Sequence, residues 1–309
     1  MDIAVIGSNM VDLISYIDRM PGEGETVEAP SFAIGCGGKG ANQAVASARL
    51  GSEVFMLTRV GNDVFADNTI DNFRRNGIDT EFVLRTDTTS GVAPIFVDPQ
   101  SHNSIIIVKG ANGHLSPADI DAAAHKISAC QLIVLQLEIP LETVYAAIQF
   151  GKEHGIPVLL NPAPAQPDLE LEKVKDCTYF VPNESELSLL TGMPVDTLAD
   201  IENAAHALLD SGIRDVIVTL GSKGALWVNG AGARLFEAPT VDAVDTTGAG
   251  DAFIGCFSHE LVANGDVESA IQTAIRYASD SDRPPFTGRF GPHLRISEDA
   301  AQIVPARSG

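Results

Sequence analysis

The stretch IAVIG, Ile3–Gly7, is a short apolar run that ends in glycine, and such a run is typical of a buried strand in a parallel sheet. An apolar run followed by a polar tip recurs four times further along the chain: QLIVLQLE (131–138), PVLLNPAP (157–164), TYFVPNE (178–184) and DVIVTLG (215–221). Helical patterns lie between these runs, for example LETVYAAIQFGKEHG, ending at Gly155, and IENAAHALLDSG, ending at Gly212. The alternation predicts an α/β fold with a mostly parallel sheet, helices on both faces, and ligand-binding groups where the strands end.

Two segments interrupt this rhythm and read as strands with a period of two. They run over Leu13–Phe32 and Glu81–Val108 and include GVAPIFV and NSIIIVK. We expect them to form a small β-sheet lid, covering about residues 13–34 and 81–110, on a single α/β domain that spans residues 1–309. From residue 279 the helical periodicity stops and prolines and arginines become frequent, so residues 279–309 form an atypical C-terminal tail.

The charge balance limits the classes of partner. The chain of 309 residues carries 41 acidic and 20 basic residues, a net charge of −21, so its average surface repels polyanions. Nucleic acid and anionic membrane are therefore excluded as expected partners, whereas a small anionic substrate stays open. The four cysteines are far apart and form no C-x-x-C pair, and neither a signal peptide nor an apolar stretch of about 20 residues is found. These features predict a cytoplasmic protein with free thiols.

The loop FAIGCGGKGANQAV (32–45) satisfies G-x-G-x-x-G and contains a Gly-Lys pair. A dinucleotide fingerprint should directly follow the first strand, but this loop begins well after Gly7. A triphosphate loop needs a hydroxyl residue after the lysine, and Gly40 stands there. What remains is a glycine-rich turn that opens a helix over 40–51, with Lys39 and Asn42 facing one cleft, or a tight turn without a ligand.

A second glycine turn, in AVDTTGAGDAFIGCF (243–257), carries the strongest chemical signal. Gly248, Ala249 and Gly250 would present backbone N–H groups at the N-terminus of a helix that begins near Asp251, and such a turn stabilises negative charge. A carboxylate beside an anion hole is the pairing that phosphoryl transfer to an alcohol needs. The alternative is that Asp251 only caps its helix.

Four motifs together, GGKGANQAV, NPAPA, PNESEL and DTTGAGDAF, closely resemble those of the ribokinase family, the PfkB-type carbohydrate kinases, over Met1 to about Tyr277. The resemblance implies a ribokinase-like three-layer sandwich with a central, mostly parallel sheet and a β-sheet lid. It implies ATP-dependent phosphorylation of the 5-hydroxyl of a pentose, 2-deoxy-D-ribose or D-ribose. It further implies Mg²⁺, K⁺ and ATP as cofactors and co-substrate, and a homodimer formed through the lid.

The same resemblance implies roles for individual residues. It implies Asp251 as the catalytic base, with Gly248, Ala249 and Gly250 as the anion hole. Sugar contacts are implied for Met10, Asp12, Gly38, Lys39, Asn42, Glu138 and Asp251. ATP contacts are implied for Asn183, Thr219, Gly221, Ser222, Gly224 and Gly250. Metal contacts are implied for Asn183 and Glu186, which would hold Mg²⁺ largely through water, and for Asp245 and Thr247, which would bind K⁺. Asn183 and Glu186 also fit a helix capping box, and both roles can hold together.

The sequence departs from the family pattern at two places. Met10 stands where an asparagine of the family bonds a ribose hydroxyl, and a thioether is a poor hydrogen-bonding partner. We therefore expect 2-deoxyribose to be preferred, unless Met10 only packs beside the sugar. After Ala278 the chain lacks the family's sequence that closes the potassium site and borders the adenine pocket, so we expect impaired K⁺ activation and adenine affinity. Three alternatives follow: a catalytically impaired pentose-binding relative, a kinase for another small sugar or nucleoside, and a nicotinamide-dependent oxidoreductase, which fails on motif position.

Overall fold

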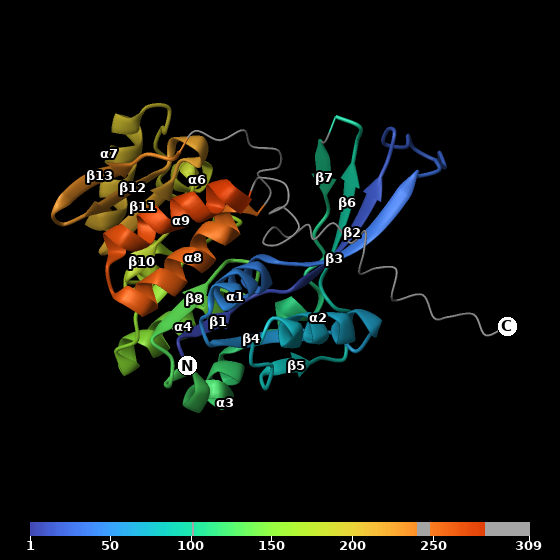
Figure 1. Cartoon of the computed structure of the whole chain (residues 1–309), viewed down its shortest axis with the longest axis horizontal. Helices are drawn as coiled ribbons and strands as arrows, with labels where there is room; N and C mark the ends of the chain where they lie inside the picture. The colour runs from blue at the N-terminus through green and yellow to red at the C-terminus, as the bar shows by residue number, and fades with distance from the viewer. Residues whose placement is uncertain (101, 240–247, 282–309) are drawn as a thin grey trace.

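A nine-stranded sheet forms the body of the molecule (Figure 1). The structure is a computed structural model and describes residues 1–100, 102–239 and 248–281. From one edge to the other, the strands are β13 (Gly232–Phe236), β12 (Ala225–Asn229), β11 (Asp215–Thr219), β10 (Tyr179–Phe180), β9 (Val158–Leu160), β8 (Leu132–Leu135), β1 (Ile3–Ile6), β4 (Val54–Val60) and β5 (Val83–Arg85). All neighbours from β11 to β5 pair in parallel, and β12 and β13 add an antiparallel edge. The predicted mostly parallel sheet is confirmed.

Helices cover both faces of this sheet because its strands are apolar on both sides. Ala4 and Ile6 of β1 belong to one core cluster, whereas Ile3 and Val5 belong to the other. The first cluster is covered by α3 (Pro117–Ile127), α4 (Leu141–His154), α5 (Leu171–Val174), α6 (Glu184–Thr191) and α7 (Leu198–Asp210). The second is covered by α1 (Lys39–Leu50), α2 (Val64–Arg75), α8 (Ala249–Asn264) and α9 (Val267–Ser281). The layers position the N-termini of α1 and α8 near the ends of the parallel strands.

A separate four-stranded sheet projects from the body and forms the predicted lid (Figure 1). Its strand order is β3 (Ser31–Gly37), β2 (Met10–Tyr16), β6 (Val92–Val97) and β7 (Asn103–Ile105). Its bounds differ from the expected 13–34 and 81–110. The first part begins at Met10 and ends at Gly37, and the second begins at Val92, because Val83–Arg85 pairs with β4 as the edge of the large sheet. A three-residue apolar run does not reveal which sheet it joins.

The chain crosses between body and lid at points where backbones pack very closely. A Cβ on Gly38 would lie 2.7 Å from the nitrogen of Met10, and one on Gly91 would lie 2.3 Å from Nδ2 of Asn112. Asn112 is fully buried and donates from Nδ2 to the backbone oxygen of Asn9 (2.6 Å), while its Oδ1 accepts from the Asn9 N–H (3.0 Å). This amide joins the first and last crossings, so the base of the lid has one fixed backbone geometry.

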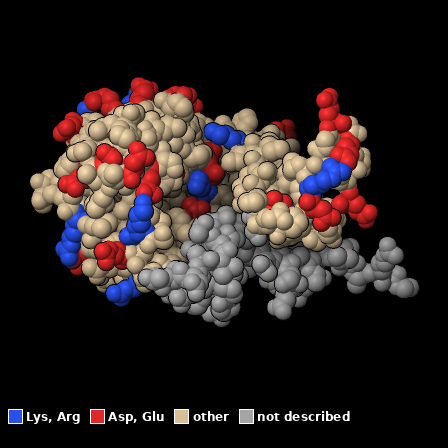
Figure 2. Space-filling model, turned by 90° about the horizontal axis from the view of Figure 1, so that it is seen from above, with Lys and Arg blue, Asp and Glu red and all other residues tan. Residues whose placement is uncertain are grey.

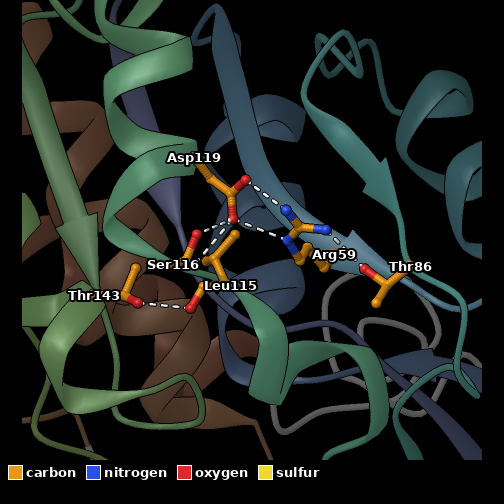
Figure 3. A network of polar contacts seen from close by, with 6 residues as sticks. All are labelled: Arg59, Thr86, Leu115, Ser116, Asp119 and Thr143. Atoms are coloured by element: carbon orange, nitrogen blue, oxygen red, sulfur yellow. Dashed lines mark hydrogen bonds and ion pairs between the residues drawn. The ribbon is translucent and has the colours of Figure 1, made fainter.

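A buried ion pair anchors the chain that returns from the lid (Figure 3). Arg59 of β4 donates from Nε to Asp119 Oδ2 (2.9 Å) and from Nη2 to Asp119 Oδ1 (2.6 Å), and its Nη1 donates to Thr86 (2.9 Å). Asp119 is also the third residue of α3 and forms a capping box with Ser116. The bidentate pair therefore fixes the start of α3, and the 3₁₀ helix η1 (Gly110–His114) that precedes it, against the large sheet.

Candidate active site

Asp251 lies at the N-terminal end of α8 and is held by two amides of α1. Its side chain is 7% exposed, its Oδ2 accepts from Nδ2 of Asn42 (2.9 Å), and its Oδ1 accepts from Nε2 of Gln43 (3.0 Å). The N-cap residue of α8 is Gly248, with φ of 89°. Asp251 therefore does not serve as the N-cap of its helix. Its carboxylate instead faces α1 and accepts hydrogen bonds from it.

The turn from Gly248 to Gly250 leads directly into Asp251 at the start of α8. Gly248 adopts the left-handed conformation that favours glycine, and a Cβ added to Gly250 would meet no atom within 4 Å in the described structure. The partial positive charge of the helix N-terminus thus adjoins open space beside the Asp251 carboxylate. This arrangement can stabilise a transferring phosphate while the carboxylate accepts a proton.

Two further carboxylates, those of Asp12 and Glu138, are buried at the base of the lid. Their exposed fractions are 5% and 6%. Oε2 of Glu138 accepts from Oγ of Ser8 (2.5 Å) and from the backbone N–H of Lys39 (2.9 Å), which ties the glycine loop to the end of β8. Asp12 is the third residue of β2 rather than a strand tip, and its carboxylate lies over Gly37, where a Cβ would be 2.4 Å from Oδ2. A side chain at position 37 would therefore displace the Asp12 carboxylate.

Burial and the nearby charge of Glu138 raise the pKa of Asp12 from its ordinary 3.8 to about 7. A carboxylate with this environment lacks donors, and hydroxyl groups of a bound polyol would supply them. The pair is therefore suited to accept hydrogen bonds from a sugar.

Lys39 connects the carboxylates electrostatically. Asp251 is the largest cause that raises the pKa of this half-buried lysine, and Glu138 and Glu186 raise it further, whereas burial acts in the opposite direction. Three elements that are distant in sequence thus place carboxylates around the cation at the start of α1: the starts of α6 and α8 and the end of β8. Charged side chains of both signs lie together in the furrow between body and lid (Figure 2).

Asn183 and Glu186 form the capping box that the sequence allowed. Oδ1 of Asn183 accepts from the N–H of Glu186 (2.8 Å), and Oε2 of Glu186 accepts from the N–H of Asn183 (2.9 Å). Burial raises the pKa of Glu186, which the N–H of Asn183 and the charge of Lys39 partly offset. Because the cap engages Oε2, the other carboxylate oxygen could serve as a ligand for a hydrated divalent cation.

The residues predicted to bind ATP follow β11. Thr219 ends this strand, and Gly221 and Ser222 belong to the 3₁₀ helix η2 (Gly221–Lys223). Gly224 packs so closely on β13 that a Cβ would lie 1.9 Å from the oxygen of Phe236, whereas one on Gly221 would meet nothing within 4 Å. A cavity of about 750 Å³ borders Phe236 and extends to Arg276 of α9. The turn and the cavity thus share β13 as a wall.

Met10 lies in the first position of β2, 2% exposed. Its sulfur is 3.7 Å from Nδ2 of Asn112, and a Cβ on Gly91 would lie 2.8 Å from it. The thioether therefore sits in the tightly packed base of the lid, two residues before Asp12.

Several predicted features fall outside the described residues. These are the potassium ligands Asp245 and Thr247 and residues 282–309 of the atypical tail. Within the described ranges, no group of three or more His, Cys, Asp and Glu side chains could hold a metal ion, and no helix is long and apolar enough to cross a bilayer.

Sequence reasoning missed the neutral polar groups of the site. Ser8, Gln43, Gln136 and Asn112 are all nearly or fully buried, and each makes hydrogen bonds to a site residue or its neighbour. A signal did exist for two of them. Gln43 directly follows Asn42 in the glycine-loop motif, and Gln136 stands within the polar tip of an otherwise apolar strand.

Comparison with known proteins agrees with this geometry. The model of the family described as pfkB family carbohydrate kinase matches residues 1–281. The chain is 61% identical to the deoxyribokinase of Salmonella typhi over 306 residues, covering 96% of this chain and 100% of that protein. It is 41% identical to the ribokinase of Schizosaccharomyces pombe over 288 residues, covering 89% and 90%. The structure of Arabidopsis thaliana ribokinase complexed with ribose and ATP matches with a TM-score of 0.84 at 30% identity, covering 91% and 92%.

The fold and the site thus define a sugar kinase. The chain belongs to the pfkB family of carbohydrate kinases, and its α/β sandwich with a separate small sheet is the ribokinase-like fold. The predicted family, fold class and enzyme class are confirmed.

The pKa of Asp12 generates a stability prediction. Because its folded pKa of about 7 exceeds the unfolded 3.8, the folded state holds the extra proton. The stability from this proton is complete below pH 3.8 and is lost as pH rises through 7. Asp12→Asn removes this pH dependence. The free energy of unfolding of the variant minus that of the parent should therefore be about 2 kcal/mol larger at pH 8 than at pH 5.5. Urea unfolding at both pH values measures this, and an equal difference at the two values would contradict it.

Proposed function

We propose that the chain is an ATP-dependent pentose kinase that phosphorylates the 5-hydroxyl of 2-deoxy-D-ribose or D-ribose. The observation that carries the proposal is the buried Asp251 carboxylate at the mouth of α8, facing Lys39. The substrate class is supported by the names of the relatives, a deoxyribokinase and ribokinases, and by the neighbour that is complexed with ribose and ATP. The buried pair Asp12 and Glu138 suits sugar hydroxyls.

In this mechanism the oxygen of the sugar's 5-hydroxyl attacks the γ-phosphorus of ATP, and Asp251 accepts the hydroxyl proton. The new O–P bond forms as the bond to the β–γ bridging oxygen breaks, and ADP leaves. The N–H groups of Gly248, Ala249 and Gly250 stabilise the charge on the transferred phosphoryl group, aided by the helix N-terminus. Asp12, Glu138 and Asn42 bind the sugar, with Gly38 and Lys39 closing the loop beside it.

The nucleotide is proposed to bind along Thr219, Gly221, Ser222 and Gly224, with its base toward the cavity beside β13. Mg²⁺ would be held through water by Asn183 and Glu186, where it supplies charge neutralisation for the ATP phosphates. The free carboxylate oxygen of Glu186, near Lys39 and Asp251, supports this assignment. K⁺ at Asp245 and Thr247 remains an expectation, as does its impairment by the altered tail.

The alternative of an impaired sugar-binding relative is not favoured. The family match covers residues 1–281, and the carboxylate, anion turn and lysine of the site lie together. The free thiols of Cys36, Cys130, Cys177 and Cys256 support a reducing, cytoplasmic location.

The sugar preference is proposed to depend on Met10. The side chain is buried at the base of the lid beside Asn112, so a sugar next to it meets a thioether instead of a hydrogen-bonding group. A hydroxyl left without a partner there costs binding energy, which disfavours ribose relative to its 2-deoxy analogue.

Asp251→Asn tests the proposed activity. Loss of the base should lower kcat for 2-deoxyribose by at least a thousandfold, while sugar binding, measured by calorimetry, changes less than fivefold. The assay is ADP release over a panel of pentoses, hexoses and nucleosides. Parent-like turnover by the variant, or no sugar-dependent ADP release by the parent chain, would overturn the proposed function.

Met10→Asn tests the sugar preference. The new amide can bond a 2-hydroxyl, so the ratio of kcat/KM for ribose to that for 2-deoxyribose should rise about tenfold or more, the equivalent of one good hydrogen bond. Met10→Leu is the matched control, because it keeps an apolar group of similar volume and should leave the ratio within threefold. An unchanged ratio in Met10→Asn would remove Met10 from specificity.

A homodimer through the lid is proposed from its exposed apolar residues. Phe32, Ile106 and Ile107 are 58%, 56% and 48% exposed on or beside the small sheet, which is unusual for isoleucine and phenylalanine. Ile106→Lys with Ile107→Lys should convert a dimer to a monomer in sedimentation velocity. Leu198→Lys, at a residue 43% exposed on α7, is the control and should remain dimeric. A monomeric parent chain would contradict the proposal.

A further inference from the structure

A chain of buried side-chain amides reaches Asp251 from the large sheet. Nε2 of Gln43 donates to Oδ1 of Asp251 (3.0 Å) and to Oδ1 of Asn161 (3.1 Å), and Oε1 of Gln43 accepts from Nε2 of Gln136 (2.6 Å). Asn161 in turn donates from Nδ2 to the backbone oxygen of Val181 (2.8 Å). Gln43, Gln136 and Asn161 are 0%, 1% and 9% exposed. The three amides thus connect the ends of β8, β9 and β10 to the proposed base.

The direction of this chain is set by the carboxylate. An ionised carboxylate only accepts hydrogen bonds, so the nitrogen of Gln43 must face Asp251 and its oxygen must face Gln136. Gln136 then turns its nitrogen to Gln43, which leaves its own Oε1 buried without a hydrogen-bond donor. That oxygen lies against Gly7 and Gly40, where an added Cβ would be 2.1 and 2.9 Å from it. An unpaired buried oxygen costs free energy, so the arrangement is not the one that stability alone would select.

Close packing of α1 on α8 brings Gln43 within reach. Gly255 lies one turn after Asp251, and a Cβ there would be 2.4 Å from the Cβ of Ala46 and 2.9 Å from the oxygen of Gln43. Oγ of Ser47 lies between the two helices, 3.0 Å from the backbone oxygen of Gln43 and 3.0 Å from that of Gly255, and can donate to either. The helix separation at Gln43 is therefore fixed by backbone contact rather than by flexible side chains.

We propose that Gln43 is a positioning residue for catalysis: backed by Gln136 and Asn161, it fixes the Asp251 carboxylate so that Oδ2 faces the sugar hydroxyl. The inference rests on the proposed function, in which Asp251 is the base. Asn42, the preceding residue, donates to Oδ2, whereas Gln43, which is 0% exposed, donates to Oδ1. In the proposed geometry Oδ2 is the oxygen for the sugar hydroxyl, and Gln43 holds the carboxylate from the other side.

This role predicts a separation of kcat from KM. Small errors in the placement of a catalytic group cost orders of magnitude in rate, whereas sugar affinity depends on other side chains. Gln43→Met keeps the volume and removes the donor. With 2-deoxy-D-ribose and saturating MgATP, we expect kcat to fall at least tenfold while the KM for sugar stays within twofold.

Two further variants separate positioning from damage to the fold. Ser47→Ala removes the neighbouring bond between α1 and α8 without touching Asp251, and it should lose stability but keep kcat within twofold. Gln136→Met removes the support of Gln43 together with the unpaired oxygen, so it should fold and lower kcat about threefold or more. If Gln43→Met does not fold, the kcat of Gln136→Met alone tests the inference.

The results also separate this inference from the proposed function. A parent-like kcat in folded Gln43→Met, or in Gln136→Met where that variant decides, overturns the inference. So does an equal fall of kcat in Ser47→Ala. If Asp251→Asn retains parent-like turnover, the proposed function fails instead, whatever the amide variants do.

Discussion

The burial of four carboxylates, three of them around one lysine, is the constraint on which the site depends. All four carboxylates are less than 10% exposed: Asp12, Glu138, Glu186 and Asp251. The last three raise the pKa of Lys39. Burying like charges together is unfavourable unless each has hydrogen-bond donors. The protein provides backbone and side-chain donors to Glu138, Glu186 and Asp251. Asp12 is left with the largest pKa shift of the four, so the cost of burial is concentrated at the junction of lid and body.

The lid follows from the same constraint. Asp12 lies inside a lid strand, whereas Glu138 follows a strand of the body, so the two carboxylates come together only where lid and body meet. The glycines Gly37, Gly38 and Gly91 let the backbones of the two parts approach until a Cβ would overlap. The bonds of Asn112 to Asn9 and the Arg59–Asp119 pair hold this junction from the body side. The position of Asp12 is therefore a property of backbone packing.

Local patterns in the sequence were sufficient to predict the fold, and they selected the charged residues that the structure brings together around Lys39. Apolar runs ending in polar tips identified β1, β8, β9, β10 and β11, and the two glycine turns identified the starts of α1 and α8. The sequence could not assign Val83–Arg85 to the large sheet, because pairing with β4 is a long-range contact that a short strand does not encode. It also began the first lid segment at Leu13, whereas β2 begins at Met10 and includes Asp12.

The buried amides Gln43, Gln136 and Asn161 were not predicted for a different reason, and their chemistry explains why they are used. They carry no charge and lie far apart in the sequence, so only the fold brings them together. A cation in contact with the base would orient it equally well but would also stabilise its ionised form and weaken it as a proton acceptor. An amide donor fixes the carboxylate with less of this penalty. Lys39 then interacts with Glu138 and Glu186 as well as with Asp251. The orientation of the proposed base depends on amide groups that do not titrate.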